Sequence, residues 1–244
     1  MSLNREQMLI EMGISPLWEL RGVPSEAVRQ PAEQLEAIAE PADPPPLPTP
    51  PASGCDVGSL DWPALEEGIR ACRRCPLGQQ RRQAVPGIGD RRPDWLFIGE
   101  GPGAEEDQRG EPFVGQAGKL LDAMLAAISL ERGQGVYIAN AVKCRPPNNR
   151  TPEAAEMAAC SPWLERQIEL LKPRVIVLLG KAAVHSVLGG DRALASLRGR
   201  AHEYRGIPVA VTYHPAYLLR NLPDKAKAWE DLLFARRLLA EGKR

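Results

Sequence analysis

The sequence of 244 residues lacks the features that would place it in several specialised classes of protein. It has no run of about 18 uninterrupted apolar residues, so we expect no membrane-spanning helix. Its first residues, MSLNREQMLIEMG, lack the basic and then apolar pattern of a secretory signal. Aromatic residues make up only 5%, and no internal repeat is visible. Because hydrophobic residues reach an ordinary 43%, we expect a soluble, cytoplasmic, globular protein.

The formal net charge of zero conceals an uneven distribution of charge along the chain. Residues 1–67 carry 12 acidic and 3 basic side chains, whereas residues 68–244 carry 28 basic and 19 acidic ones. A basic body with an acidic extension is typical of a domain that binds a polyanion. Charged side chains that are unevenly spread over solvent-exposed faces and bind nothing give the same distribution, so charge alone leaves both interpretations open.

A proline-rich segment divides the chain. Residues 41–52, PADPPPLPTPPA, cannot form a helix or a sheet ladder, because proline lacks the backbone N–H and fixes φ. We expect this segment to form a semi-rigid polyproline II spacer. The chain is therefore divided into an amphipathic arm, a linker and a body, at residues 1–40, 41–59 and 60–244.

The body alternates apolar runs with helical patterns. Four runs are expected to form strands, at residues 95–99, 136–142, 175–179 and 207–211. Helices are expected at residues 118–130, from a capping Thr151 to about residue 171, and at residues 224–239. This order predicts an α/β fold, a three-layer α/β/α sandwich around a central, mostly parallel four-stranded sheet.

The loop after the first predicted strand is rich in glycine, with the sequence Gly99-Glu-Gly-Pro-Gly103. Loops in this position meet at the carboxyl edge of a parallel sheet, where ligands bind. Glycines let a ligand approach the backbone and leave N–H groups free to donate. The loop matches neither the Walker A pattern nor the G-x-G-x-x-G pattern of nucleotide-binding loops, and it has no phosphate-binding lysine. The acidic residues that follow it would repel a phosphate. An ordinary turn between a strand and a helix is the alternative interpretation.

Two further polar side chains lie at predicted strand ends. His214 is a candidate to stabilise developing negative charge or to transfer a proton, although a lone histidine is more often structural. Asn140 lies in an apolar strand, where an amide is costly unless it is hydrogen-bonded. Its side chain offers both a donor and an acceptor to the edge of a base.

Four of the five cysteines form a candidate metal-binding set. Cys72 and Cys75 form a C-x-x-C motif, and Cys144 and Cys160 follow far along the chain. Four thiolates can enclose a zinc ion or an iron–sulfur cluster, and the arginines around the motif would compensate a negatively charged cluster. Unrelated buried cysteines are the alternative. Cys55, at the edge of the linker, is expected to be a free bystander.

Together these residues resemble family 4 uracil-DNA glycosylases, the iron–sulfur branch of the uracil-DNA glycosylase superfamily. The matching stretches lie in family order and at family spacing over about residues 65–240. They are CRRCPL (72–77), GEGPGAEEDQRGEPFVGQAG (99–118), NAVKCRPPNNRTP (140–152), Cys160, VIVLLG (175–180) and TYHPAYLLRN (212–221). Each stretch alone is weak evidence, whereas the combination is highly specific.

The resemblance implies an enzyme that hydrolyses the N-glycosidic bond of uracil in DNA after the nucleotide has been turned out of the base stack. It implies that Phe113 stacks on the uracil, that Asn140 reads its Watson–Crick edge and that Glu106 excludes thymine. Gly99 and Gly101 would place the loop backbone against the substrate.

The resemblance also implies the catalytic groups. Glu100 would hold the attacking water and stabilise the cationic sugar, with help from Asn148. His214 would donate a hydrogen bond to uracil O2 as the base leaves. A related branch carries an inserted histidine that bonds to the sugar, and residues 149–152 lack this insertion, so we expect ordinary turnover.

The implied cofactor is a 4Fe-4S cluster on Cys72, Cys75, Cys144 and Cys160. The implied partner is uracil-containing DNA, and we expect a monomer in the cytoplasm, associated with the nucleoid and not with a membrane. Residues 1–22 weakly resemble the N-terminal peptide of the clamp-loader psi subunit, which predicts a docking peptide. A helix packed on its own domain and a disordered extension are the alternatives for this arm.

Two other functions compete with a glycosylase. One is a catalytically inactive iron–sulfur or zinc protein of the same fold that binds nucleic acid, which the joint presence of Glu100, Asn140 and His214 disfavours. The other is a zinc-stabilised nucleotide-binding module, which the acidic loop and the missing phosphate-binding lysine disfavour.

Overall fold

A computed structural model describes residues 56–242 of the chain. The predicted arm, most of the linker and Cys55 lie outside the described residues. Residues Val57–Ser59, which we assigned to the linker, form a 3-10 turn (η1). Val57 is 5% exposed and belongs to a hydrophobic cluster with Leu65 and Trp163, so the body begins a few residues earlier than residue 60.

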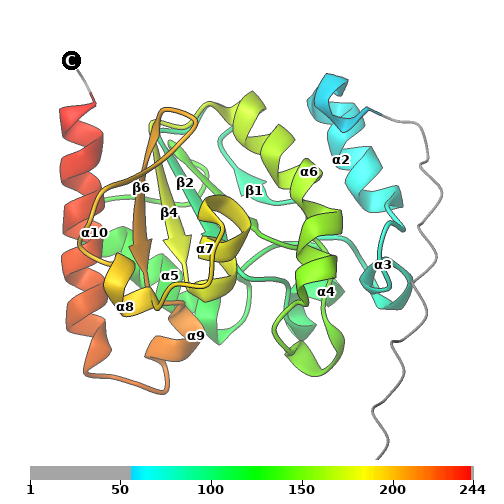
Figure 1. The fold of residues 1–244 in the computed structure, drawn as a ribbon. Coiled ribbons are helices and arrows are strands. Elements are labelled where there is room, and N and C mark those ends of the chain that lie inside the picture. The colour runs from blue at the N-terminus through cyan, green and yellow to red at the C-terminus, as the bar shows by residue number, and fades with distance from the viewer. Residues whose placement is uncertain (1–55, 243–244) are drawn as a thin grey trace, which may run out of the picture. The chain divides into compact units, whose positions relative to one another are not determined.

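A six-stranded sheet forms the centre of the body, with the strand order β1-β3-β2-β4-β6-β5 (Figure 1). Its four inner strands are parallel, namely β2 (Trp95–Gly99), β3 (Val136–Asn140), β4 (Val175–Leu179) and β6 (Ile207–Thr212). Two short edge strands, β1 (Ile88–Gly89) and β5 (His202–Tyr204), pair antiparallel with them. The predicted α/β fold is confirmed. The sheet has six strands and not the predicted four, because the two short edge strands were not recognised in the sequence.

Helices cover both faces of the sheet, which explains why the inner strands are apolar without alternation. Alternate residues of a strand point to opposite faces, so Phe97 packs toward α5 (Gln116–Ala127) and α10 (Asp224–Glu241). Ile98 packs on the other side, toward α6 (Ala154–Leu171) and α7 (Lys181–Leu188). The predicted three layers are therefore present.

A third apolar cluster lies outside α6 and holds the first helices of the body. It joins Leu65 and Ile69 of α2 (Trp62–Ala71) and Leu77 of α3 (Leu77–Gln80) to Trp163 of α6. Short helices connect the remaining elements, namely α4 (Ala104–Arg109), η2 (Pro147–Asn149), α8 (Leu194–Leu197) and α9 (Pro215–Leu218).

Helix α6 does not begin at the predicted cap. Its N-cap is Glu153, whose backbone N–H donates to the Glu156 carboxylate at 2.8 Å. The prediction of Thr151 as the cap was therefore wrong: the helix begins two residues later, where Glu153 and Glu156 form a capping box.

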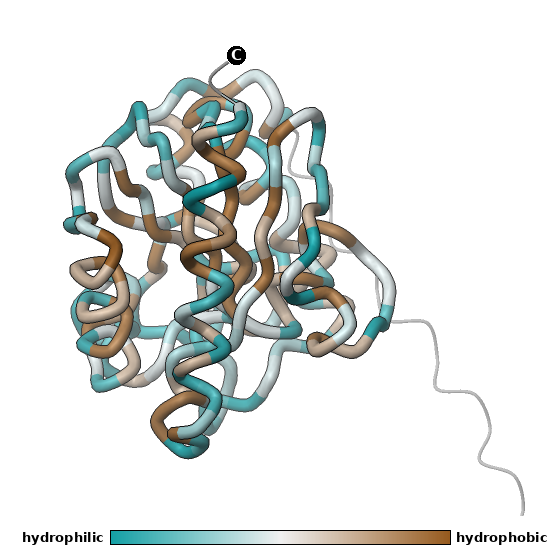
Figure 2. Tube along the Cα trace, turned by 90° about the vertical axis from the view of Figure 1, so that its left-hand side faces the viewer, coloured by the Kyte–Doolittle hydropathy of each residue, from teal (hydrophilic) through white to brown (hydrophobic). Residues whose placement is uncertain are grey.

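Helix α10 is a surface helix. Figure 2, in which α10 faces the viewer, shows hydrophobic and hydrophilic segments alternating along it, and its buried side is formed by residues that include Leu232 and Ala235.

In the part of the chain that the structure describes, no helix combines the length and the apolar character needed to cross a bilayer.

A buried ion pair holds α10 to the segment after α8. Arg198 donates to the Asp231 carboxylate from Nε at 2.7 Å and from Nη2 at 3.1 Å, and Asp231 is 3% exposed. We expect Arg198→Met to lower the free energy of unfolding by roughly 3–5 kcal/mol in urea titrations, because it leaves a buried carboxylate without a counter-charge.

The exposed pair of Lys181 and Asp191 serves as the control for this substitution. Its two side chains are 67% and 82% exposed, so solvent screens their attraction and Asp191→Asn should leave the urea midpoint unchanged. Equal midpoints for the Arg198→Met protein and the wild type would contradict the assignment of the buried pair.

Candidate active site

The carboxyl ends of the parallel strands open into a cavity of about 800 Å³. Its walls come from the loop after β2, the segment before α5, the segment after η2, and the end of β6 with α9. Five predicted site residues line it, namely Glu100, Gly101, Glu106, Phe113 and His214. The glycine-rich loop, the Phe113 segment and the histidine thus meet at one edge of the sheet, as the sequence predicted.

Glu100 supplies a carboxyl group to the cavity from the end of β2. Burial raises the pKa of Glu100 above its ordinary value, and hydrogen bonding by the Thr151 side chain opposes this shift. Thr151, which we predicted as a helix cap, instead lies in the cavity wall. A carboxylate with a raised pKa is a stronger base than an exposed one, which suits it to activating water.

Asn140 ends β3 directly beside Gly99 of β2, its partner in the sheet register. It is 1% exposed, and its Oδ1 has no hydrogen-bond partner among the described residues. A Cβ atom on Gly99 would lie 2.5 Å from both Asn140 Oδ1 and Phe113 Cζ. Because Gly99 has no side chain, the amide and the phenyl ring can close over the strand end. The amide oxygen lies behind the cavity wall, buried and without a hydrogen-bond partner among the described residues, which is unusual for a buried polar atom.

Phe113 adopts a left-handed backbone conformation, with φ 55°, which is unfavourable for a bulky residue. Arg132 holds it there, because its Nη2 donates to the Phe113 carbonyl at 2.7 Å and its Nη1 to that of Pro112 at 2.9 Å. The Phe113 ring stacks against the His214 ring with centroids 5.5 Å apart. Arg132 thus positions an aromatic wall of the cavity, a role that the sequence analysis missed.

Glu106 joins two walls of the cavity through its carboxylate. Its Oε1 accepts from the N–H groups of Val114 at 2.9 Å and Gly115 at 3.1 Å, and its Oε2 accepts from that of Gly103 at 3.0 Å. Gly103 and Gly115 are the N-caps of α4 and α5. The side chain therefore fixes the glycine-rich loop and the segment after Phe113 relative to each other, a role that we did not predict.

His214 is the N-cap of α9, and its Nδ1 accepts a hydrogen bond from the Ala216 N–H at 3.2 Å. In the neutral ring the proton is therefore assigned to Nε2, which is left as a donor. Burial, with a smaller contribution from the Arg220 charge, lowers the pKa of His214 to about 4, against the effect of Glu106. The ring is neutral at physiological pH.

Asn148 lies outside the cavity wall. It is exposed at a positive φ of 54° in η2, and the neighbouring Asn149 and Arg150 line the cavity in its place. Arg150 is held by two hydrogen bonds to the buried Glu156 carboxylate, at 2.7 and 2.8 Å. The structure therefore does not bring Asn148 to Glu100, and the predicted assistance stays a prediction.

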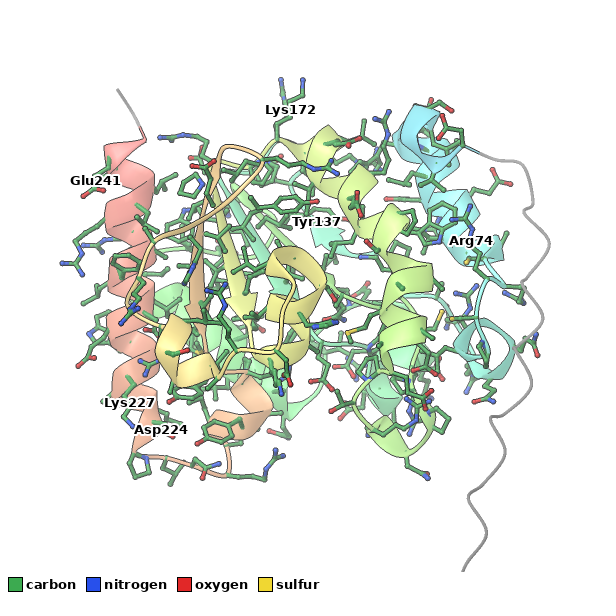
Figure 3. All side chains as sticks on the ribbon, viewed as in Figure 1. Arg74, Tyr137, Lys172, Asp224, Lys227 and Glu241 are labelled. Atoms are coloured by element: carbon green, nitrogen blue, oxygen red, sulfur yellow. The ribbon has the colours of Figure 1, made fainter. Side chains whose placement is uncertain are left out.

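The four predicted ligand cysteines line one small, separate cavity between α2, α3 and α6. Two donors reach their sulfur atoms: Arg81 Nη1 donates to Cys144 Sγ at 2.9 Å, and the backbone N–H of Lys143 donates to Cys160 Sγ at 3.3 Å. Burial raises the pKa of the Cys144 thiol to about 11 and that of Cys160 to about 12. The guanidinium of Arg74, labelled beside α2 in Figure 3, covers the Trp163 ring at 5.1 Å.

The cysteine cavity does not form a compact site for a single ion. Within residues 56–242, no three His, Cys, Asp or Glu side chains are close enough to hold one metal ion. Four thiols that line one cavity are a donor set that both a zinc ion and an iron–sulfur cluster accept.

Comparisons with known proteins show the family of the chain. The model of the uracil DNA glycosylase superfamily matches residues 86–233. The chain is 44% identical to the type-4 uracil-DNA glycosylase of Pyrobaculum aerophilum, over 71% of this chain and 92% of the relative. It is 45% identical to the type-4 enzyme of Thermotoga maritima, over 67% and 85%, and 35% identical to the type-5 enzyme of Thermus thermophilus, over 60% and 78%. The chain belongs to the uracil DNA glycosylase superfamily.

Proposed function

We propose that the protein is a uracil-DNA glycosylase, which hydrolyses the bond between uracil and deoxyribose and leaves an abasic site in DNA. The observation that carries this proposal is the convergence of a carboxyl group, an unpaired amide oxygen and a neutral imidazole at the carboxyl edge of the sheet, where Glu100 follows β2, Asn140 ends β3 and His214 follows β6. The names of the type-4 relatives support it. The enzyme would act as a monomer in the cytoplasm, at the nucleoid, to start base excision repair.

Uracil would be recognised by its shape and by its Watson–Crick edge. The Phe113 ring offers a face on which a flipped base stacks. The unpaired Oδ1 of Asn140 would accept from uracil N3–H, and its amide N–H₂ would donate to O4. Cytosine carries an acceptor at N3 and a donor at N4, so the same amide rejects it. Glu106 would exclude thymine by occupying the space beside C5.

Catalysis would use Glu100 and His214 on opposite sides of the bond that breaks. As the C1′–N1 bond breaks, its electron pair passes to uracil, and His214 Nε2–H donates to the negative charge that develops on O2. Such a donor is worth about 3 kcal/mol of barrier. The Glu100 carboxylate stabilises the cationic sugar and accepts a proton from the water that bonds to C1′.

The test is uracil release from a uracil-containing oligonucleotide, followed by alkaline cleavage at abasic sites. We expect Glu100→Gln to lower the single-turnover rate by roughly 10²- to 10⁴-fold, because the amide cannot accept the proton. The wild-type rate should fall as the pH drops through the raised pKa of Glu100, since the carboxylate is then protonated. His214 stays neutral over this range because its pKa is about 4.

Glu230→Gln, which removes an exposed carboxylate on α10, is the matched control and should keep the wild-type rate and pH profile. A wild-type protein that releases no uracil would refute the function. A rate that rises as the pH falls would refute the role of Glu100.

We also propose that Cys72, Cys75, Cys144 and Cys160 hold a 4Fe-4S cluster. The cavity that the four cysteines share and the Arg81 guanidinium beside the Cys144 sulfur support this assignment, as does the type-4 name of the relatives. A bound cluster would cross-link α2 and α3 to α6 and to the loop after β3. The steps proposed above are assigned to residues of the catalytic cavity, and none of them is assigned to the cluster.

Serine in place of Cys144 or Cys160 should abolish absorbance near 400 nm, lower the iron content and lower the melting temperature, because a link between distant segments is lost. Cys55→Ser should keep the colour, since Cys55 is the predicted bystander. Purified wild-type protein that contains stoichiometric zinc and no iron would contradict the cluster.

We propose, finally, that residues 1–22, which lie outside the described residues, dock a clamp-loader partner, with Ile14 and Trp18 as the large anchors. Because Val57 belongs to the core, the matching truncation begins at residue 53. The truncated chain should lose co-purification with clamp-loader subunits while it still releases uracil from short oligonucleotides. Retained co-purification would refute docking through the arm.

A further inference from the structure

A second groove, of about 500 Å³, lies apart from the catalytic cavity and is lined by arginines. They come from the end of α2 and the turn after it, from the segment after α3, and from the end of α4. These residues are Arg70, Arg73, Arg81, Arg82 and Arg109, and the acidic residue in the wall is Glu111. This arginine groove is therefore strongly positive, and it suits an anionic ligand.

The charges of this groove are only partly used within the protein. Arg81 is engaged by the Cys144 sulfur and by backbone carbonyls, and Arg70 pairs with Glu66 at 3.3 Å. Arg82 and Arg109 are exposed, and neither side chain has a hydrogen bond or ion pair among the described residues. Neither lines the cysteine cavity, so a bound cluster does not account for their charge.

The groove is fixed to the catalytic cavity by α4. Asp107 of α4 accepts hydrogen bonds from the N–H groups of Arg82 at 2.9 Å and Gln83 at 3.3 Å. The neighbouring Glu106 holds the catalytic loop, as described above. One short helix therefore sets the position of Arg82 relative to the cavity.

The distance between the catalytic cavity and the arginine groove equals the length of a few base pairs of duplex DNA. The first turn of α4 lines the cavity and Arg109 at its last position lines the groove. Six helical residues span about 9 Å at 1.5 Å per residue. Since base pairs rise by 3.4 Å, this span corresponds to about three base-pair steps of duplex DNA.

We propose that the arginine groove binds the phosphodiester backbone of the DNA duplex that flanks the flipped nucleotide, a few base pairs from the uracil. Guanidinium groups suit this ligand because they donate two parallel hydrogen bonds to a phosphate. Contacts of this kind set the position of a protein on DNA without reading its sequence. The inference rests on the proposed function, since it places the substrate in the catalytic cavity.

The test measures binding of the full chain to a fluorescent duplex without uracil, by anisotropy at several salt concentrations. Each phosphate contact contributes about −0.9 to the slope of log K against log salt. The double variant Arg82→Gln/Arg109→Gln should therefore have a slope shallower by roughly 2 and an affinity roughly 10- to 100-fold lower at 0.1 M salt. Replacing both residues with lysine should keep most of the slope, because the charges remain.

The matched control removes two arginines from another surface. Arg236→Gln/Arg237→Gln changes exposed side chains on α10, on the side of the sheet away from α3 and α4 (Figure 1). It should leave the affinity and the slope at their wild-type values. A slope for the Arg82→Gln/Arg109→Gln protein equal to that of the wild type, or an equal loss in the control, would overturn the proposal.

This experiment separates the groove from the proposed function, because duplex binding requires no uracil release. A wild-type protein that shows the expected salt slope but releases no uracil would refute the glycosylase and leave the groove supported. A wild-type protein that releases uracil, with variants that bind as tightly as it does, would refute the groove alone. Both positions are exposed, and equal melting temperatures would show that the variants fold.

Discussion

The shape of the cavity at the candidate active site depends on the hydrogen bonds of one carboxylate. Glu106 accepts from three backbone N–H groups, two of which belong to the N-caps of α4 and α5, Gly103 and Gly115. The N-terminal N–H groups of a helix have no partner within the helix, and a negative charge there is further stabilised by the helix dipole. Asp107, the next residue, bonds in the same way to the segment that carries Arg82. Two adjacent carboxylates on a six-residue helix thus organise both faces on which the substrate would lie.

The central fold could be predicted because it is encoded locally. The four inner strands are continuous apolar runs, since helices bury them on both faces. The edge strands β1 and β5 escaped prediction because runs of two and three residues are too short to carry a periodic signal. The start of α6 was misplaced for a related reason: Thr151 and Glu153 are both plausible caps, and the choice depended on Glu156 and on contacts of Thr151 within the cavity.

The sequence predicted those candidate site residues that lie in a recognisable motif after a strand. It did not predict the residues, distant in sequence, that fix the position of the site side chains. Glu100 and His214 follow strands and so were expected at one edge. Arg132 bonds to the Phe113 carbonyl across 19 positions in the sequence, and no spacing rule anticipates such a contact. Asn148 shows the converse limit, because membership in a motif did not place its side chain in the cavity wall.

The cap that His214 provides to its own helix has a consequence for the reaction cycle. With Nδ1 held by the Ala216 N–H, the imidazole cannot exchange tautomers unless the start of α9 comes apart. The ring then acts as a fixed dipole and not as a proton carrier, so in the proposed reaction the base departs as an anion that takes its proton from solvent. Under the proposed mechanism, the histidine would begin and end each cycle in the same protonation state, and no step would be needed to restore it after the uracil has diffused away.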